Sequence, residues 1–116
     1  MAKKTVIITF NHPPFSGNFC QEGLRAVVGT QLSIDEQDVK SIFMGDGVYF
    51  GLKDVEQQDF QKYLKTMKSS EMDIYLEEES INERHIQKEQ LNSDFKILPR
   101  AEVLKLFKES DHVLAF

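Results

Sequence analysis

The run TVIITF at Thr5–Phe10 is β-branched or aromatic and nearly all apolar. Such a run is typical of a strand that is buried on both faces, as in the interior of a parallel sheet. The breaker run NHPP at Asn11–Pro14 follows at once and ends the strand. Because the apolar run is far too short for a signal-sequence core or a membrane span, we expect a cytoplasmic protein with no membrane partner.

Four more strands and several helices are predicted outward from this run. The further strands are predicted at Val39–Met44, Met72–Leu76, Phe95–Leu98 and His112–Phe116. Helices are predicted at Phe19–Gln31, around Phe60–Met67, from Ser80, where S-x-x-E has the form of a capping box, and at Arg100–Glu109 directly after Pro99. Strands that alternate with helices in this way predict an α/β fold with a mainly parallel five-stranded sheet. With 116 residues, we expect a single domain over residues 1–116.

Charge and cysteine content exclude several classes of function. The chain has 14 basic and 19 acidic residues, hence a net charge of −5. The basic residues are scattered, so direct binding to nucleic acid is not expected. The single cysteine, Cys20, excludes an internal disulfide and a cysteine cluster for zinc or iron–sulfur. Cys20 shares an apolar helix stripe with Leu24 and Val27, so we interpret it as packed and slow to react, although a first-turn position favours a thiolate.

The carboxyl ends of the predicted strands form a candidate ligand or interface edge, because ligands of open α/β sheets bind there. Its candidate residues are His12, Ser16, Gly17, Asn18, Gly45, Asp46, Gly47 and Tyr49. The loop before the first helix could cradle a phosphate, but it lacks the Walker lysine and the G-x-G-x-x-G spacing, and capping geometry explains it equally well. Tyr49 and Phe50 are two large rings at a predicted surface, which indicates a contact surface or a lined pocket.

The acidic run Glu77–Glu79 is the other candidate at this edge. It could serve as a metal or general-base cluster, but no histidine or aspartate is spaced to join it. Like charges at a strand end are typically solvated or paired with basic residues of a partner. The histidines His12, His85 and His112 share no ligand spacing. We therefore expect no metal site, no cofactor and no catalytic residue.

Four stretches carry a resemblance to a known family. They are PFSG leading to EGLR within Pro14–Arg25, IFMGDGVY at Ile42–Tyr49, IYLEEESINER at Ile74–Arg84, and SDHVLAF at Ser110–Phe116. In this order and spacing the chain resembles the DsrE/DsrF/TusC-like sulfur-relay family, and most closely its DsrF/TusC branch. The resemblance implies a Rossmann-like or flavodoxin-like three-layer fold around a five-stranded sheet, which agrees with the element pattern above.

The resemblance also implies a function. Members of the family pass persulfide sulfur in the cytoplasm, for tRNA thiolation or sulfur oxidation. They assemble as trimers or hexamers, homomeric or heteromeric, with DsrE-type and DsrH-type subunits. In DsrE-type subunits a cysteine at the end of the third strand carries the sulfur, and the matching position here is Glu77. Because a carboxylate cannot form a persulfide, we interpret the chain as a non-catalytic subunit that lacks the sulfur-carrying cysteine.

Two other hypotheses stay open. The chain could be a small-ligand or nucleotide-binding protein that uses the loops 11–18 and 45–47, or a thiol carrier that uses Cys20. We also expect Glu78 and Glu79 to raise the pKa of any thiol placed at Glu77, because like charges disfavour a thiolate. The Arg-Gly pair that follows the third strand in the family is Arg84-His85 here.

Overall fold

The computed structural model describes residues 5–13, 23, 25–26, 38–53, 62, 64–66, 68 and 73–116. Its elements, in chain order, are β1 (Thr5–Phe10), β2 (Asp38–Phe43), the 3₁₀ helix η1 (Gly45–Gly51), β3 (Asp73–Glu77), α3 (Glu78–Glu83), the 3₁₀ turn η2 (Lys88–Gln90), β4 (Lys96–Leu98), α4 (Arg100–Glu109) and β5 (His112–Ala115). All five predicted strands are confirmed, each to within about two residues at either end.

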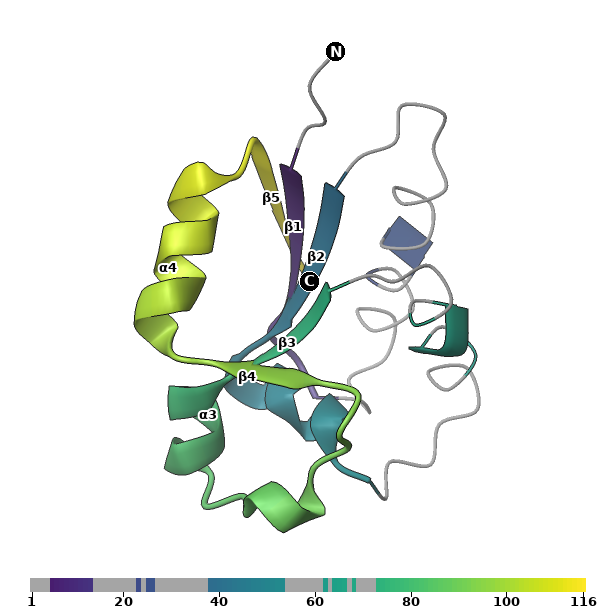
Figure 1. The fold of residues 1–116 in the computed structure, drawn as a ribbon, viewed down its shortest axis with the longest axis vertical. Coiled ribbons are helices and arrows are strands. Elements are labelled where there is room, and N and C mark those ends of the chain that lie inside the picture. The colour runs from purple at the N-terminus through teal and green to yellow at the C-terminus, as the bar shows by residue number, and fades with distance from the viewer. Residues whose placement is uncertain are drawn as a thin grey trace.

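The five strands form one sheet in the order β4-β3-β2-β1-β5, and every neighbouring pair is parallel. The α/β fold is therefore confirmed, and the carboxyl ends of all five strands meet at one edge (Figure 1). The predicted helices at Phe19–Gln31 and Phe60–Met67 lie largely outside the described residues. Within them, Gly23 and Leu64 are described and are helical.

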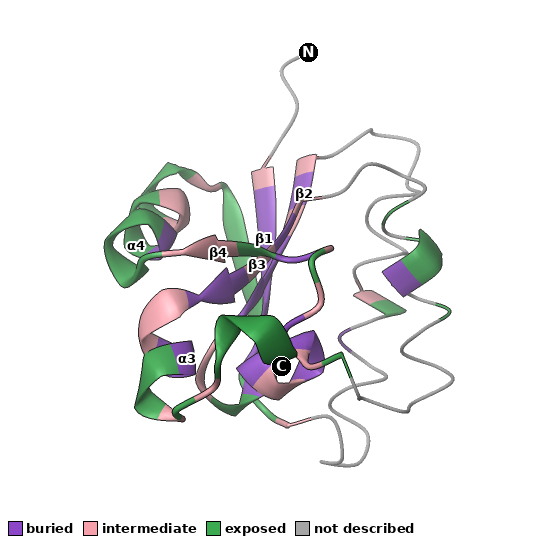
Figure 2. Ribbon diagram, turned by 60° about the horizontal axis from the view of Figure 1, so that its bottom comes forward, coloured by how far each residue is buried: buried purple, intermediate pink, exposed green. Residues whose placement is uncertain are grey.

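Alternate residues of the strands supply two apolar clusters, one on each face of the sheet. On one face Val6, Ile8 and Phe10 of β1 join a large cluster of buried apolar residues, in which the rings of Phe10 and Phe43 stack with centroids 4.5 Å apart. On the other face Ile7 packs with two buried partners beneath α4. Figure 2 shows the inner strands buried between these layers.

The expectation that Tyr49 and Phe50 are two rings at the surface is wrong for Phe50. Phe50 is buried and its ring lies 5.3 Å from that of Phe43, while Tyr49 is half-buried. The cause is Gly47, which brings η1 against the sheet: a Cβ at this position would overlap the carbonyl oxygen of Phe10. Only glycine permits so close an approach of two backbones, and the approach turns the second ring inward.

The C-terminus of α3 shows what the second residue of the Arg84-His85 pair does, where the family has Arg-Gly. The amides of His85 and Ile86 donate to the carbonyls of Asn82 and Ile81, at 3.1 and 3.2 Å, which is the Schellman pattern of a helix C-terminus. This pattern needs a left-handed residue, and His85 takes that conformation at φ 55°. Glycine would adopt it with less strain, because a side chain disfavours positive φ.

Strand β5 lies at the edge of the sheet and is exposed on both faces. Val113 and Leu114 are 45% and 44% exposed, and Leu104 on the neighbouring α4 is 50% exposed. The sequence predicts this apolar strand, and the structure confirms its place beside β1.

Candidate functional site

The described parts of the three candidate segments meet at the carboxyl edge of the sheet. The Met44 amide donates to the Phe10 carbonyl at 3.0 Å, which joins the ends of β2 and β1. The Gly45 amide donates to Ser80 Oγ at 2.9 Å, which joins η1 to α3. These backbone and side-chain bonds fix the positions of the loop ends, and Glu77 lies where β3 passes directly into α3.

Glu77 is the central residue of the edge, and its side chain is only 1% exposed. Two donors converge on its Oε1 atom: Ser80 Oγ at 2.5 Å and Arg100 Nη2 at 2.9 Å. The expectation that the acidic run is solvated or paired with a partner is therefore wrong for Glu77. Since β3 and β4 are parallel neighbours, their ends bring the carboxylate and the guanidinium together within one chain.

The predicted capping box at Ser80 is also wrong. Helix α3 begins at Glu78, so Ser80 lies inside it, and the N-cap residue is Glu77. The strand joins the helix with no intervening loop, so the Ser80 hydroxyl faces back toward the strand end and finds the Glu77 carboxylate. Ser80 is itself buried, which makes this a buried polar pair.

An ion pair and a backbone contact lie beside Glu77. Arg84 donates from Nε and Nη2 to Asp46 Oδ1, at 3.1 and 2.9 Å, and from Nη1 to the Ser80 carbonyl at 3.1 Å. The backbone amide of Arg100 donates to both carboxylate oxygens of Glu79, at 3.0 and 2.8 Å. Glu79 thus binds the first turn of α4. Together, the Arg84 and Glu79 side chains link α3 to η1 and to α4.

The electrostatics of the site favour an anion at Glu77. Burial by itself would raise the pKa of the Glu77 carboxyl. The hydrogen bonds from Arg100 and Ser80, with the positive charges of Arg100 and Arg84, outweigh burial and hold that pKa below its ordinary value. From the sequence we expect Glu78 and Glu79 to raise the pKa of a thiol placed here; at the carboxyl that the chain has, the charges that shift the pKa are those of Arg100 and Arg84, and they lower it.

The second oxygen of Glu77 is unusual. Oε2 is buried, and the structure gives it no hydrogen-bond partner within the described part of the chain. A buried carboxylate normally has partners on both oxygens. The donors of this site therefore converge on one point, the position of Oε1.

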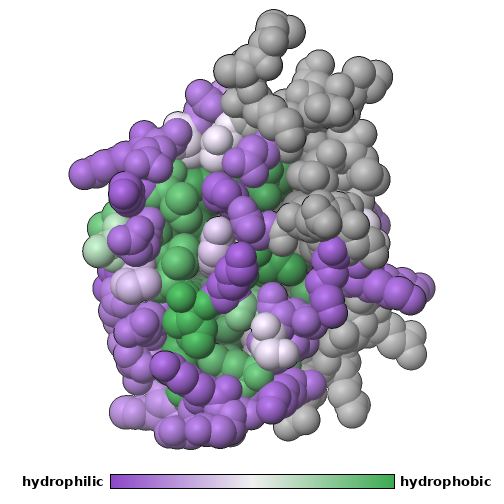
Figure 3. Space-filling view, viewed as in Figure 1, coloured by the Kyte–Doolittle hydropathy of each residue, from purple (hydrophilic) through white to green (hydrophobic). Residues whose placement is uncertain are grey.

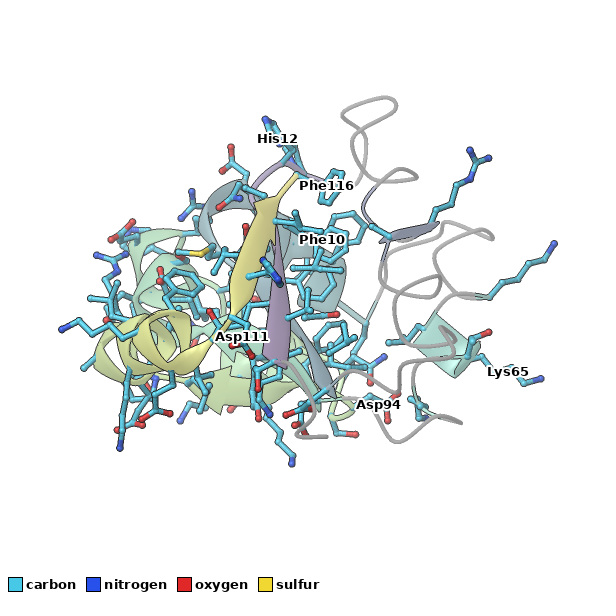
Figure 4. All side chains as sticks on the ribbon, turned by 90° about the horizontal axis from the view of Figure 1, so that it is seen from above. Phe10, His12, Lys65, Asp94, Asp111 and Phe116 are labelled. Carbon is cyan, nitrogen blue, oxygen red and sulfur yellow. The ribbon has the colours of Figure 1, made fainter. Side chains whose placement is uncertain are left out.

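The remaining predicted candidates are spread along the edge. His12 is exposed just beyond β1, and Figure 4 shows it beside Phe116, at the opposite end of β5 from Asp111. Asp46 binds Arg84, as described above. The candidates Ser16, Gly17, Asn18 and Cys20 lie outside the described residues.

In the loop 45–47, one of the two loops of the nucleotide hypothesis, the amides of Gly45 and Gly47 already have acceptors within the chain. The Gly45 amide donates to Ser80, and the Gly47 amide donates to the Met44 carbonyl at 2.9 Å. Across the described residues, no group of three or more potential ligands gathers that could hold a metal ion. No helix in this described part is long and apolar enough to cross a bilayer.

Three residues of the site, Ser80, Arg84 and Arg100, were not predicted from the sequence as site residues. Arg100 could have been predicted from the sequence. It comes just after β4, Glu77 is the last residue of β3, and adjacent parallel strands end at the same edge of the sheet. The role of Ser80 is hidden by its place in a pattern that is typical of helix caps.

The family of the chain follows from its match over nearly the whole sequence. A family model for the DsrE/DsrF-like family matches residues 4–116. The chain belongs to this family.

Solved structures agree with the fold. The crystal structure of the ychN protein from E. coli is 21% identical, with a TM-score of 0.83 over 99% of this chain and 100% of the other. A protein of unknown function from Methanobacterium thermoautotrophicum, MTH1491, is 8% identical, with a TM-score of 0.79 over 98% of this chain and 100% of the other. No curated protein gives a significant match to the chain.

Proposed function

We propose that this DsrE/DsrF-like chain is a non-catalytic subunit of a cytoplasmic sulfur-relay complex and carries no sulfur itself. The observation that carries the proposal is Glu77, which occupies the position that resembles the sulfur-carrying site of the family. Its side chain is buried and bound on Oε1 by Ser80 and Arg100. A carboxylate cannot attack or accept sulfane sulfur, because that chemistry needs a thiolate.

Mass spectrometry of the intact protein tests this proposal. After treatment with a persulfide donor, the wild-type chain should show no added sulfur. The matched variant Glu77→Cys, made together with Cys20→Ser, should gain the mass of one sulfur atom, because Arg100 and Ser80 face that position and favour a thiolate. A persulfide on the wild-type chain would refute the proposal, and its loss on Cys20→Ser would assign the sulfur to Cys20.

We further propose that the subunit assembles through β5, with a second copy of the chain as partner in the purified protein. Val113 and Leu114 are exposed on opposite faces of this edge strand. Among the described residues of the face that α4 covers, Met44, Tyr75 and Leu98 are apolar and only partly buried. Apolar side chains are visible there between hydrophilic ones in Figure 3. Exposed apolar edges of this kind usually mark interfaces.

Light scattering tests the assembly. The wild-type chain should have at least twice the mass of one 13.4 kDa chain at micromolar concentration. The variant Val113→Glu should shift the mass toward one chain, because it places a charge on the apolar strand. His112→Glu, at an exposed polar position of the same strand, is the control and should leave the mass unchanged. A wild-type chain of monomeric mass would contradict this part of the proposal.

A further inference from the structure

The donors around Glu77 resemble those with which proteins bind small anions. A guanidinium and a hydroxyl point at one atom, Oε1, and the Gly45 amide polarises the hydroxyl by donating to Ser80 Oγ at 2.9 Å. Arg84, which donates to the Ser80 carbonyl at 3.1 Å, adds a second positive charge that acts on Glu77. Charge-assisted hydrogen bonds of this kind are the strong ones, and they are stronger in a buried site.

Glu77 fits these donors only in part. Its Oε1 atom receives both bonds, whereas Oε2 is buried without a partner in the described structure. The donors are therefore arranged for an anion at the position of Oε1, and the rest of the carboxylate is not specifically bound. Arg100 and Ser80 thus form an anion-binding position, and the carboxylate of Glu77 is the anion that occupies it.

We propose that the position of Glu77 Oε1 is an anion-binding site which this chain fills with its own carboxylate. When that side chain is removed, a small external monoanion of about the size of a carboxylate group should bind between Arg100 and Ser80. The biological role of this site rests on the proposed function: because the carboxylate of Glu77 fills the site, the subunit does not bind anionic sulfur from a partner there. The site itself rests only on the contacts above.

Formate binding to Glu77→Ala tests the inference. Formate is the carboxylate head group without its chain, and the alanine variant leaves room for it. We expect formate to raise the melting temperature of Glu77→Ala in a saturable way, with a millimolar dissociation constant, and to have no such effect on the wild-type chain. All titrations are made at constant ionic strength against sodium chloride.

Two variants distinguish formate binding at a specific site from a general effect of removing one negative charge. Glu83→Ala also removes one negative charge beside Arg84 and Arg100, but Glu83 is exposed, so no buried space is opened. It should not respond to formate. The double variant Glu77→Ala/Arg100→Gln should bind formate about tenfold more weakly or not at all, because it lacks the charged donor.

Each outcome decides the question. If Glu77→Ala is unfolded in chloride, the same titration is read as recovery of the folded circular dichroism signal. The inference is overturned if formate neither stabilises nor restores this variant, or if Glu83→Ala responds equally. A persulfide on the wild-type chain would refute the proposed function but would leave the formate result intact, so the two failures are distinguishable.

Discussion

Replacing Ser80 by alanine removes one buried hydroxyl and almost no volume, so its effect isolates the polar contacts of the site. Ser80 Oγ accepts from the Gly45 amide at 2.9 Å and donates to Glu77 Oε1 at 2.5 Å. The variant leaves a part-buried amide without its acceptor, at about 1–3 kcal/mol, and takes from a buried carboxylate a hydrogen bond worth about 1.5–3 kcal/mol. Because one hydroxyl serves both partners, the two costs do not add fully. We expect Ser80→Ala to lower the free energy of unfolding by about 3 kcal/mol.

Urea unfolding followed by far-ultraviolet circular dichroism at pH 7 measures this loss. With a slope of about 1.5–2 kcal/mol per molar urea, the midpoint should fall by roughly 1.5–2 M. The matched control is Ser110→Ala, since Ser110 Oγ donates only to the Phe107 carbonyl, at 2.8 Å, and is half-buried. It should cost at most about 1 kcal/mol.

A double-mutant cycle assigns the loss to Glu77. In the background Glu77→Gln the residue at 77 has no charge, so the additional cost of Ser80→Ala should fall by about 1 kcal/mol or more. The reasoning is refuted if Ser80→Ala costs no more than Ser110→Ala. If the cost is large but the same in both backgrounds, the Gly45 amide, not the carboxylate, is the partner that matters.

Two more predictions use the same unfolding assay. The folded-state pKa of Glu77 lies below its ordinary value, so Glu77 stabilises the fold above about pH 5, and this contribution is lost as the pH falls through the folded-state pKa. Glu77→Gln should therefore show a weaker fall of stability between about pH 5 and pH 3 than the wild-type chain, and parallel curves would contradict this sign. His85→Gly should be about 1 kcal/mol more stable, because His85 has φ 55°. A less stable variant would mean that contacts of the imidazole outweigh the strain.

The sheet could be predicted from the sequence because its signals are local. The apolar run Thr5–Phe10 becomes a strand with five buried residues of six, as expected for an inner strand. Helix α4 has the predicted bounds Arg100–Glu109, since Pro99 favours the start of a helix and the amphipathic pattern does not depend on distant contacts. The alternation of these elements then leaves few topologies, and a parallel sheet is one of them.

The contacts of the site could not be predicted in the same way, because they depend on the tertiary arrangement. Arg100 is 23 residues from Glu77 in the chain, and only the pairing of β3 with β4 brings them together. The environment of Phe50 depends on a backbone contact between Gly47 and Phe10, which no local pattern encodes. At Ser80 the local pattern is misleading, since S-x-x-E places the N-cap at Ser80, three residues after the observed N-cap, Glu77.

Under the proposed function, Glu77 stands where sulfur-carrying subunits have a thiolate, and this difference changes the chemistry of the position but not its charge. Both groups are monoanions, and the donors on Glu77, from Ser80 and Arg100, would stabilise either one. A neutral residue at 77 would leave the Ser80 hydroxyl and the Arg100 guanidinium without their shared acceptor, and would remove one link between α3 and α4. Glutamate therefore keeps the negative charge that these donors bind. Under the proposed function this edge has a structural role in the subunit and carries no sulfur, and the persulfide and formate experiments test the sulfur chemistry and the anion site separately.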